Sequence, residues 1–515
     1  MGASRDLNWW GWGFADARPD AAAAAPGVLA TLGFGSTAVQ TPVALATVEL
    51  PPPRLATPFS ESTADRMRHA YGRSYLDTIR AFRGRFDHVP DAVAFAREET
   101  DIERVLEWAA DHGAAVIPYG GGTSVCGGVE PAVPDRFNGT ISLDVSQLDR
   151  VLAVDDVSRS ARIQAGAPGP ALESQLAEHG MTLRFFPQSF ELSTLGGWIA
   201  TRAGGHFATV WTHIDDLVES VRALTPAGRW QSRRLPGSGA GPSPDRMLLG
   251  SEGILGVITE AWVRVQPRPR FRASRAVRFP DFLQGAEAVR AVAQSGLHPA
   301  GCRLVDALEA QQTGIGDGVS SVLVLGFEST DHDVGDRLER ALAICAAAGG
   351  AADDPRDGGG AVGAWREAFL AMPYLRDVLL QCGVLADTFE TAITWERFPA
   401  FHASVIGATR AALGEPCRVS CRFTHVYPNG PAPYYTVLAP ARRGEEIAQW
   451  HEMKAAAGDA IIAAGGTITH HHAVGRDHRP WYDRQRPDPF AAALRGAKAA
   501  VDPGGLLNPG VLIAA

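Results

Sequence analysis

The chain has 515 residues, of which 45% are hydrophobic and 20% charged, and its formal net charge at pH 7 is −9. This length exceeds what one hydrophobic core usually supports, so we expect a soluble protein with two large lobes. The acidic balance and the lack of a basic run disfavour a nucleic-acid partner.

The first 85 residues predict an arm that packs on the body of the protein. Within it, the tryptophan-rich residues 9–13 are expected to pack rather than to bind a ligand. Residues 21–25 and 51–53, a run of alanines and a run of prolines, indicate irregular connectors.

Residues 86–270 predict an α+β domain. Apolar residues recur on one face of residues 101–112, as expected of a helix, and the apolar run 114–117 reads as a short buried strand. Further elements are expected as strands at 140–144, 161–167 and 256–266, and as a helix at 170–179.

A glycine-rich loop, residues 118–128, follows the buried strand. Consecutive glycines let backbone N–H groups turn inward around a phosphate, and Thr123 and Ser124 add hydroxyl donors. No Gly-Lys-Ser/Thr follows, and no helix opens directly after the loop, so it fits neither a Walker loop nor the dinucleotide GxGxxG motif. Taken alone, a glycine triplet is more typical of a surface loop.

Two further glycine-rich segments, residues 187–205 and 249–259, change that balance. Three such backbone segments indicate an elongated ligand such as a dinucleotide. In order and separation they resemble the FAD-binding domain of the vanillyl-alcohol-oxidase (PCMH-type) flavoproteins. That resemblance implies an α+β fold: a PCMH-type FAD-binding domain of two α+β subdomains, with an antiparallel-sheet cap domain.

The resemblance also implies which residues hold FAD. They belong to the three glycine-rich segments and are Pro118, Tyr119, Gly120, Gly121, Gly122, Thr123, Ser124, Val125, Gln188, Ser189, Thr194, Gly196, Gly197, Thr201, Ala203, Gly204, Glu252, Gly253, Gly256, Val257 and Ile258. Members that tether FAD through histidine often place it near the first loop, and residues 118–130 contain none. We therefore expect non-covalent FAD.

Residues 271–466 predict a cap or substrate domain, and residues 467–515 a C-terminal segment that returns to the active site and the FAD domain. Alternating strands and one-faced helices favour a sheet covered on one side. Residues 421–427 and 434–438, separated by Asn429-Gly430, predict a hairpin.

The six cysteines, at positions 126, 302, 345, 382, 417 and 421, show no disulfide framework, which favours a reducing compartment. No apolar run approaches the about 20 residues of a membrane helix, and the N-terminus does not resemble a signal peptide. We expect a cytoplasmic protein; peripheral membrane contact and a homodimer stay open.

His470-His471-His472 is the sharpest candidate for chemistry. Three alternatives compete: a metal site, a structural role, and general acid–base catalysis, for which imidazole has a suitable pKa. Neighbouring residues on an extended chain point in different directions, which disfavours three consecutive ligands to one ion. We predict no metal.

The triplet and its surroundings, residues 469–476, resemble the alkyldihydroxyacetonephosphate synthase family. Residues 190–198, 250–261, 303–306 and 374–377 agree with that family as well. The resemblance implies an FAD-dependent transferase of ether lipid biosynthesis, which exchanges the acyl group of acyl-dihydroxyacetone phosphate for a fatty alcohol through an adduct at flavin N5.

The family's functional residues map onto six positions of this chain. Tyr434 resembles the tyrosine assigned to proton transfer, Arg376 an arginine near the reacting centre, and Arg303 an arginine on the flavin side. His470, His471 and His472 would supply further acid–base and anion-stabilising groups. We expect these residues to meet FAD between the two lobes.

An FAD-dependent dehydrogenase or oxidase of a 2-hydroxy acid or alcohol is the alternative. Metal-using members of that group carry a His-x-Gly-Asp-Gly-Asn-x-His stretch, which residues 424–431 lack, and Glu-His-Gly in place of the histidine triplet. Both differences favour the synthase.

Overall fold

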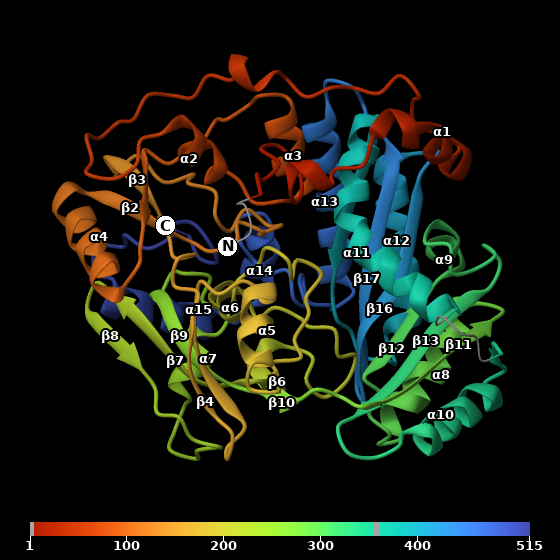
Figure 1. Cartoon of the computed structure of the whole chain (residues 1–515). Coiled ribbons are helices and arrows are strands. Elements are labelled where there is room, and N and C mark those ends of the chain that lie inside the picture. Colours follow the sequence, from red (N-terminus) through yellow and green to blue (C-terminus); the bar gives the residue numbers. More distant parts are fainter. Residues whose placement is uncertain (1–4, 355–359, 515) are drawn as a thin grey trace. The chain divides into compact units, whose positions relative to one another are not determined.

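The computed structural model describes residues 5–354 and 360–514 (Figure 1). They form two compact units that alternate along the chain. The first unit consists of the described residues up to Pro42, of Gly205–Thr212, and of the described residues from Pro269 to His470. The second consists of Val43–Gly204, of His213–Arg268, and of the described residues from His471 onward. Among the residues described, no helix is long and apolar enough to cross a membrane.

The second unit contains a small parallel sheet that carries the first glycine-rich loop. Its strand order is β1-β3-β2, with β1 Ala92–Phe95, β3 Gly139–Asp144 and β2 Ala114–Tyr119. Helix α4 (Glu99–His112) buries its predicted apolar face against this sheet. The helix, the strand after it and the glycine loop predicted from the sequence are thus confirmed.

A five-stranded antiparallel sheet completes the second unit, in the order β4-β5-β9-β7-β8. Its strands are β4 Val151–Asp155, β5 Ser160–Gln164, β9 Val257–Arg264, β7 Val218–Thr225 and β8 Gly228–Gln231. The two-residue strands β6 Met181–Thr182 and β10 Gln266–Pro267 pair with each other. The unit's other helices are α2 Thr63–Arg68, α3 Tyr75–Phe82, α5 Gly169–Ala177, α6 Leu195–Thr201, α7 Pro244–Leu248, α14 Arg479–Gln485 and α15 Asp488–Val501.

The first unit is built on a seven-stranded antiparallel sheet, in the order β14-β11-β13-β12-β16-β17-β15. Its strands are β14 Ala351–Ala352, β11 Phe271–Phe279, β13 Ser321–Ser329, β12 Gly301–Val305, β16 Arg418–Tyr427, β17 Gly430–Pro440 and β15 Val384–Glu390. Its helices are α1 Ala21–Leu32, α8 Phe282–Gln294, α9 Ala307–Gln312, α10 Gly335–Ala347, α11 Gly360–Gln381, α12 Phe398–Leu413 and α13 Glu446–Ala463. The antiparallel cap sheet and the β16–β17 hairpin are confirmed.

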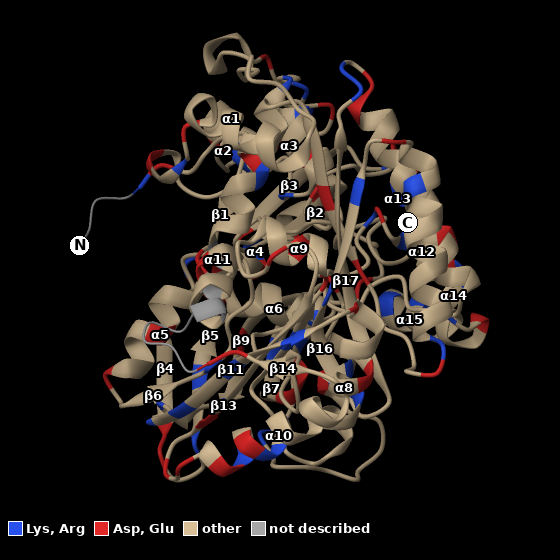
Figure 2. Ribbon diagram, turned by 90° about the vertical axis from the view of Figure 1, so that its right-hand side faces the viewer, with Lys and Arg blue, Asp and Glu red and all other residues tan. Residues whose placement is uncertain are grey.

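The expectation that helices cover this sheet on one side is wrong. Val305, Val322 and Val324 cluster with Trp365 of α11 on one face. Side chains that alternate with these point the other way, and Leu304 lies against Gly285 of α8. Both faces are therefore covered. The outer helix α10 carries acidic and basic residues side by side, as a solvated surface does (Figure 2).

The alanine run at residues 21–25 is also not the irregular connector expected. It opens helix α1, because the Asp20 side chain accepts hydrogen bonds from Ala22 N and Ala23 N and so caps the first turn. Leu32 and other buried residues of α1 pack against α11 and β15. The apolar N-terminal residues Trp10 and Trp12 are buried, as predicted.

Candidate active site

The three glycine-rich segments predicted to hold FAD come together within the second unit. Gly250 N donates to Ile199 O at 3.0 Å and Glu252 N to Ala200 O at 2.8 Å, which joins the third segment to the second. In the first segment, a Cβ on Gly121 would lie 2.0 Å from Leu192 O, and one on Gly120 would lie 2.5 Å from Thr194 Oγ1. Only glycine permits this approach of two backbones.

The first loop offers the kind of donors that a pyrophosphate needs. Between Gly121 and Val125, none of the backbone N–H groups donates to another residue of the described chain. Yet this stretch is only partly exposed, and amides in such a place usually find an acceptor. The loop therefore fits an anionic group such as the pyrophosphate of FAD.

Glu252 connects the third glycine-rich segment to the chain that follows the histidines. Its carboxylate accepts from Val474 N at 2.9 Å and from Gly475 N at 2.7 Å, while its carbonyl accepts from Asn508 Nδ2 at 2.8 Å. Burial raises the pKa of Glu252 to about 7, although these two amide hydrogen bonds act in the opposite direction. Asn508 is not among the site residues predicted from the sequence. The only sequence feature that could have indicated its role is its place in the stretch Leu-Asn-Pro-Gly.

In the first unit, Tyr434 lies on β17, which runs between β15 and β16. It is paired across the sheet with Glu390 of β15 and Arg422 of β16, so all three side chains share one face. The phenol hydroxyl donates to Thr388 Oγ1 at 3.0 Å. Burial raises the pKa of the Tyr434 phenol, and the Arg422 charge counteracts this rise.

Arg303 shares that face of the sheet, because Val305, two residues further along β12, pairs with Arg422. Arg303 Nη2 donates to His206 O at 3.0 Å, and the guanidinium carbon lies 5.5 Å from the centre of the Phe369 ring. Burial, with the nearby Arg422 charge, lowers the pKa of Arg303 to about 10. No carboxylate of the described chain pairs with Arg303, so it is a cation suited to a substrate anion.

Arg376 is half-buried on α11, the helix that covers this same face. The structure thus places three predicted residues, Tyr434, Arg303 and Arg376, on one layer of the first unit. Their catalytic roles stay predictions.

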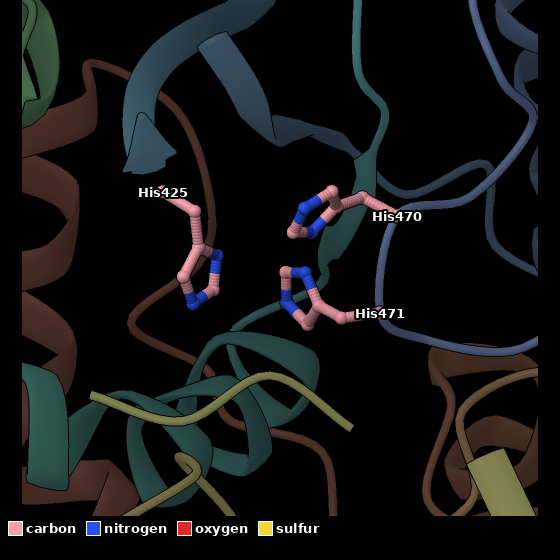
Figure 3. Close-up of side chains that lie close together, drawn as sticks. All are labelled: His425, His470 and His471. Atoms are coloured by element: carbon pink, nitrogen blue, oxygen red, sulfur yellow. The ribbon is translucent and has the colours of Figure 1, made fainter. Parts of the chain in front are cut away.

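His470 is the last residue of the first unit, and two side chains hold it there. Its backbone N donates to Glu390 Oε2, and Thr469 Oγ1 donates to Glu390 Oε1, each at 2.6 Å. On the imidazole, Nε2 lies 2.7 Å from the Tyr427 hydroxyl. Figure 3 shows the His470 ring beside that of His425, with ring centres 5.0 Å apart. Sequence reasoning had assigned no role to Glu390, Tyr427 or His425.

His471 and His472 open the last segment of the second unit, where the chain is bent rather than extended in a strand. Their rings meet edge to face at 4.7 Å, and the His472 carbonyl accepts from Cys126 Sγ at 3.1 Å. This contact ties His472 to the end of the first glycine-rich loop. The acid–base roles predicted for the three histidines stay predictions.

Comparisons with known proteins agree with this arrangement. Residues 90–232 match the family described as "FAD binding domain", and residues 268–512 match "FAD linked oxidases, C-terminal domain". An alkyldihydroxyacetonephosphate synthase of Dictyostelium discoideum is 30% identical over 479 residues, which are 87% of this chain and 77% of the relative. Its counterpart from Trypanosoma brucei brucei is 29% identical over 510 residues, or 90% and 82% of the two chains. A solved structure titled alkyldihydroxyacetonephosphate synthase superposes with a TM-score of 0.82 at 24% identity, over 99% of both chains.

Proposed function

Because the chain belongs to the alkyldihydroxyacetonephosphate synthase family, we propose that it exchanges the acyl group of an acyl-dihydroxyacetone phosphate for a fatty alcohol. The bond between the substrate carbon and the acyl oxygen breaks and a fatty acid leaves. An ether bond from the same carbon to the alcohol oxygen replaces it. Bond breaking and bond making balance, so no net oxidation takes place. FAD, when bound, supplies an electrophilic centre for the substrate carbanion.

The observation that carries this proposal is the group of side chains on the face of the sheet covered by α11. Tyr434 is a buried tyrosine whose hydroxyl is held by a hydrogen bond to Thr388, and in its phenolate form it can take a proton from the carbon next to the ketone and return it. Arg303 lies on the same face and has no carboxylate partner in the described chain. Its planar fork suits a phosphate or a leaving carboxylate, which a guanidinium binds through two hydrogen bonds.

Arg376 and His470 complete the assignment. Arg376 would add a second cation near the reacting carbon. His470 is held through its backbone by Glu390 and through its ring by Tyr427, so its imidazole is positioned to exchange a proton or to bind developing negative charge.

The test is a turnover assay with the FAD-loaded protein, an acyl-dihydroxyacetone phosphate and a long-chain alcohol under anaerobic conditions. We expect alkyl product and free fatty acid in equal amounts, with the flavin spectrum back at its oxidised form afterwards. Lasting flavin bleaching by a 2-hydroxy acid, with no ether product from the acyl substrate, would contradict the proposal and favour dehydrogenation instead.

A further inference from the structure

Arg422 is a buried cation that lies against the proposed acid–base tyrosine. It stands opposite Tyr434 in the register of β16 and β17, and its guanidinium carbon lies 3.8 Å from the centre of the phenol ring. Its side chain is only 2% exposed. A guanidinium over the face of an aromatic ring is attracted to it, most strongly where water is excluded.

Glu309 of α9 holds Arg422 in that place. One carboxylate oxygen accepts from Arg422 Nη1, and the other accepts from Ser420 Oγ at 3.1 Å. Arg422 Nη1 also lies 3.4 Å from Thr436 Oγ1. Because the Glu309 side chain is also only 2% exposed, the ion pair is shielded from solvent and its geometry is fixed.

Two carboxylates near the phenol act against its ionisation. Glu390 and Asp387, both on β15, raise the pKa of Tyr434, as burial does to a greater extent. Asp387 is itself paired with Lys454 of α13 at 3.1 Å. On the helix that covers this face, Arg376 is the charged residue of the predicted site. Arg422 is thus the cation in direct contact with the ring and opposes the effect of burial.

We propose that Arg422 is a positioning residue for proton transfer: its stacked guanidinium orients the Tyr434 ring and stabilises the phenolate that accepts the substrate proton. The proton moves from the substrate carbon to the phenolate oxygen and returns to the same carbon, so Arg422 exchanges none. Glu309 serves by keeping Arg422 under the ring. This inference rests on the proposed function.

The test removes the cation and its counter-charge together, in Arg422→Met/Glu309→Gln, so that no unpaired carboxylate stays buried. We expect kcat for the acyl exchange to fall roughly 10- to 30-fold, with FAD content per chain unchanged. The tyrosinate absorbance of Tyr434, taken as the difference between each protein and its Tyr434→Phe counterpart, should appear at higher pH than in the wild type. Glu309→Gln alone is the matched control, because it keeps Arg422 and an amide oxygen that can still accept from Arg422 Nη1 while removing only the counter-charge, and it should change kcat less than the double variant does.

Coupling to Tyr434 separates this role from a structural one. In a Tyr434→Phe background, loss of Arg422 should reduce the residual rate no further, because the group on which it acts is already gone. A further loss of the same size, with the tyrosinate band unmoved in the Tyr434-containing protein, would overturn the proposal. If the double variant does not fold, Arg422→Lys decides. Lysine keeps the charge but lacks the planar group, so wild-type kcat and a wild-type tyrosinate band in that variant would also overturn it.

The spectroscopic measurement needs no substrate, so the two hypotheses fail separately. A wild type without exchange activity contradicts the proposed function. An unmoved tyrosinate band contradicts the role of Arg422.

Discussion

Tyr434 and Tyr435 are neighbours on β17 that face opposite sides of the sheet. The hydroxyl of Tyr434 donates to Thr388 on the face that carries Arg303. Tyr435 is stacked on Phe389 with ring centres 5.0 Å apart, and its hydroxyl lies 3.2 Å from His402 Nδ1. The pair therefore offers a test in which the chemical change is the same but the surroundings differ.

Tyr434→Phe removes one hydroxyl and little volume. We expect turnover to fall by about 10²–10⁴, the range for losing a positioned acid–base group. FAD content should stay unchanged, because the glycine-rich segments are untouched. Tyr435→Phe is the matched control: it should keep its turnover and lose about 1 kcal/mol of stability through its lost contact with His402. Full activity of Tyr434→Phe in assays where the wild type turns over would remove Tyr434 from the mechanism.

Glu252 predicts a pH dependence of stability. Its pKa is raised to about 7 in the folded protein, from an ordinary value of 4.5. The folded state therefore binds this proton more tightly than the unfolded state does. Glu252 therefore contributes to the free energy of unfolding in full below about pH 4.5, and this contribution of up to about 3 kcal/mol is lost as the pH rises through about 7.

The measurement compares the free energy of unfolding of the wild type with that of Glu252→Gln across this window. Glutamine cannot ionise, and its amide group can accept from only one of the two N–H groups of Val474 and Gly475. We expect the variant to be less stable than the wild type at pH 5, and the gap to narrow towards pH 8. A gap that does not change with pH would show that Glu252 titrates normally.

At the scale of elements, the sequence predicted those features that depend on local pattern. The Asn429-Gly430 turn identified the β16–β17 hairpin, and the apolar periodicity of residues 101–112 identified α4. Local pattern can also mislead: the alanines at 21–25 indicate a connector, whereas the Asp20 cap begins a helix there. The partners of Tyr434 could not be predicted, because β15 and β12 join the hairpin through long-range pairing that no local pattern encodes.

The first glycine-rich loop illustrates the same limit and leads to a prediction. The pattern of residues 118–125 predicts a phosphate cradle, because consecutive glycines let backbone N–H groups turn toward the ligand. The structure adds a second reason, since a Cβ there would lie 2.0 Å from the Leu192 carbonyl oxygen. A backbone atom cannot move aside as the end of a side chain can.

Gly121→Ala should therefore separate the first two glycine-rich segments even without ligand. We expect loss of most bound FAD, and a lower melting temperature of the apoprotein than that of wild-type apoprotein. Gly180→Ala is the control, because a Cβ there meets nothing within 4 Å. Its φ of +68° should cost a modest amount of stability, but FAD should stay bound. Equal melting temperatures of the wild-type and the Gly121→Ala apoprotein would show that this glycine matters only for ligand binding.

At the scale of the whole molecule, the chain alternates between its two units in a way that contiguous domain boundaries do not capture. Gly205–Thr212 leaves the second unit and joins the first, where Ala208 N donates to Ala300 O and Ala208 O accepts from Val426 N. These eight residues have no compositional break on either side. His206, whose carbonyl binds Arg303, reaches the first unit by this excursion.

The same division gives the last prediction, one non-covalently bound FAD per chain. The first glycine-rich segment, the second as far as Gly204, and the third all lie in the second unit. The first loop has no histidine to form a tether. Acid precipitation should release all flavin colour into the supernatant, in an amount equal to the protein. Tyr434→Phe should release the same amount, since Tyr434 belongs to the unit that carries none of these segments, while Gly121→Ala should release little. A coloured pellet would mean a covalent bond to a side chain outside the first loop. A lower yield from Tyr434→Phe would mean that FAD retention depends on the first unit as well, and would assign Tyr434 a part in binding in addition to proton transfer.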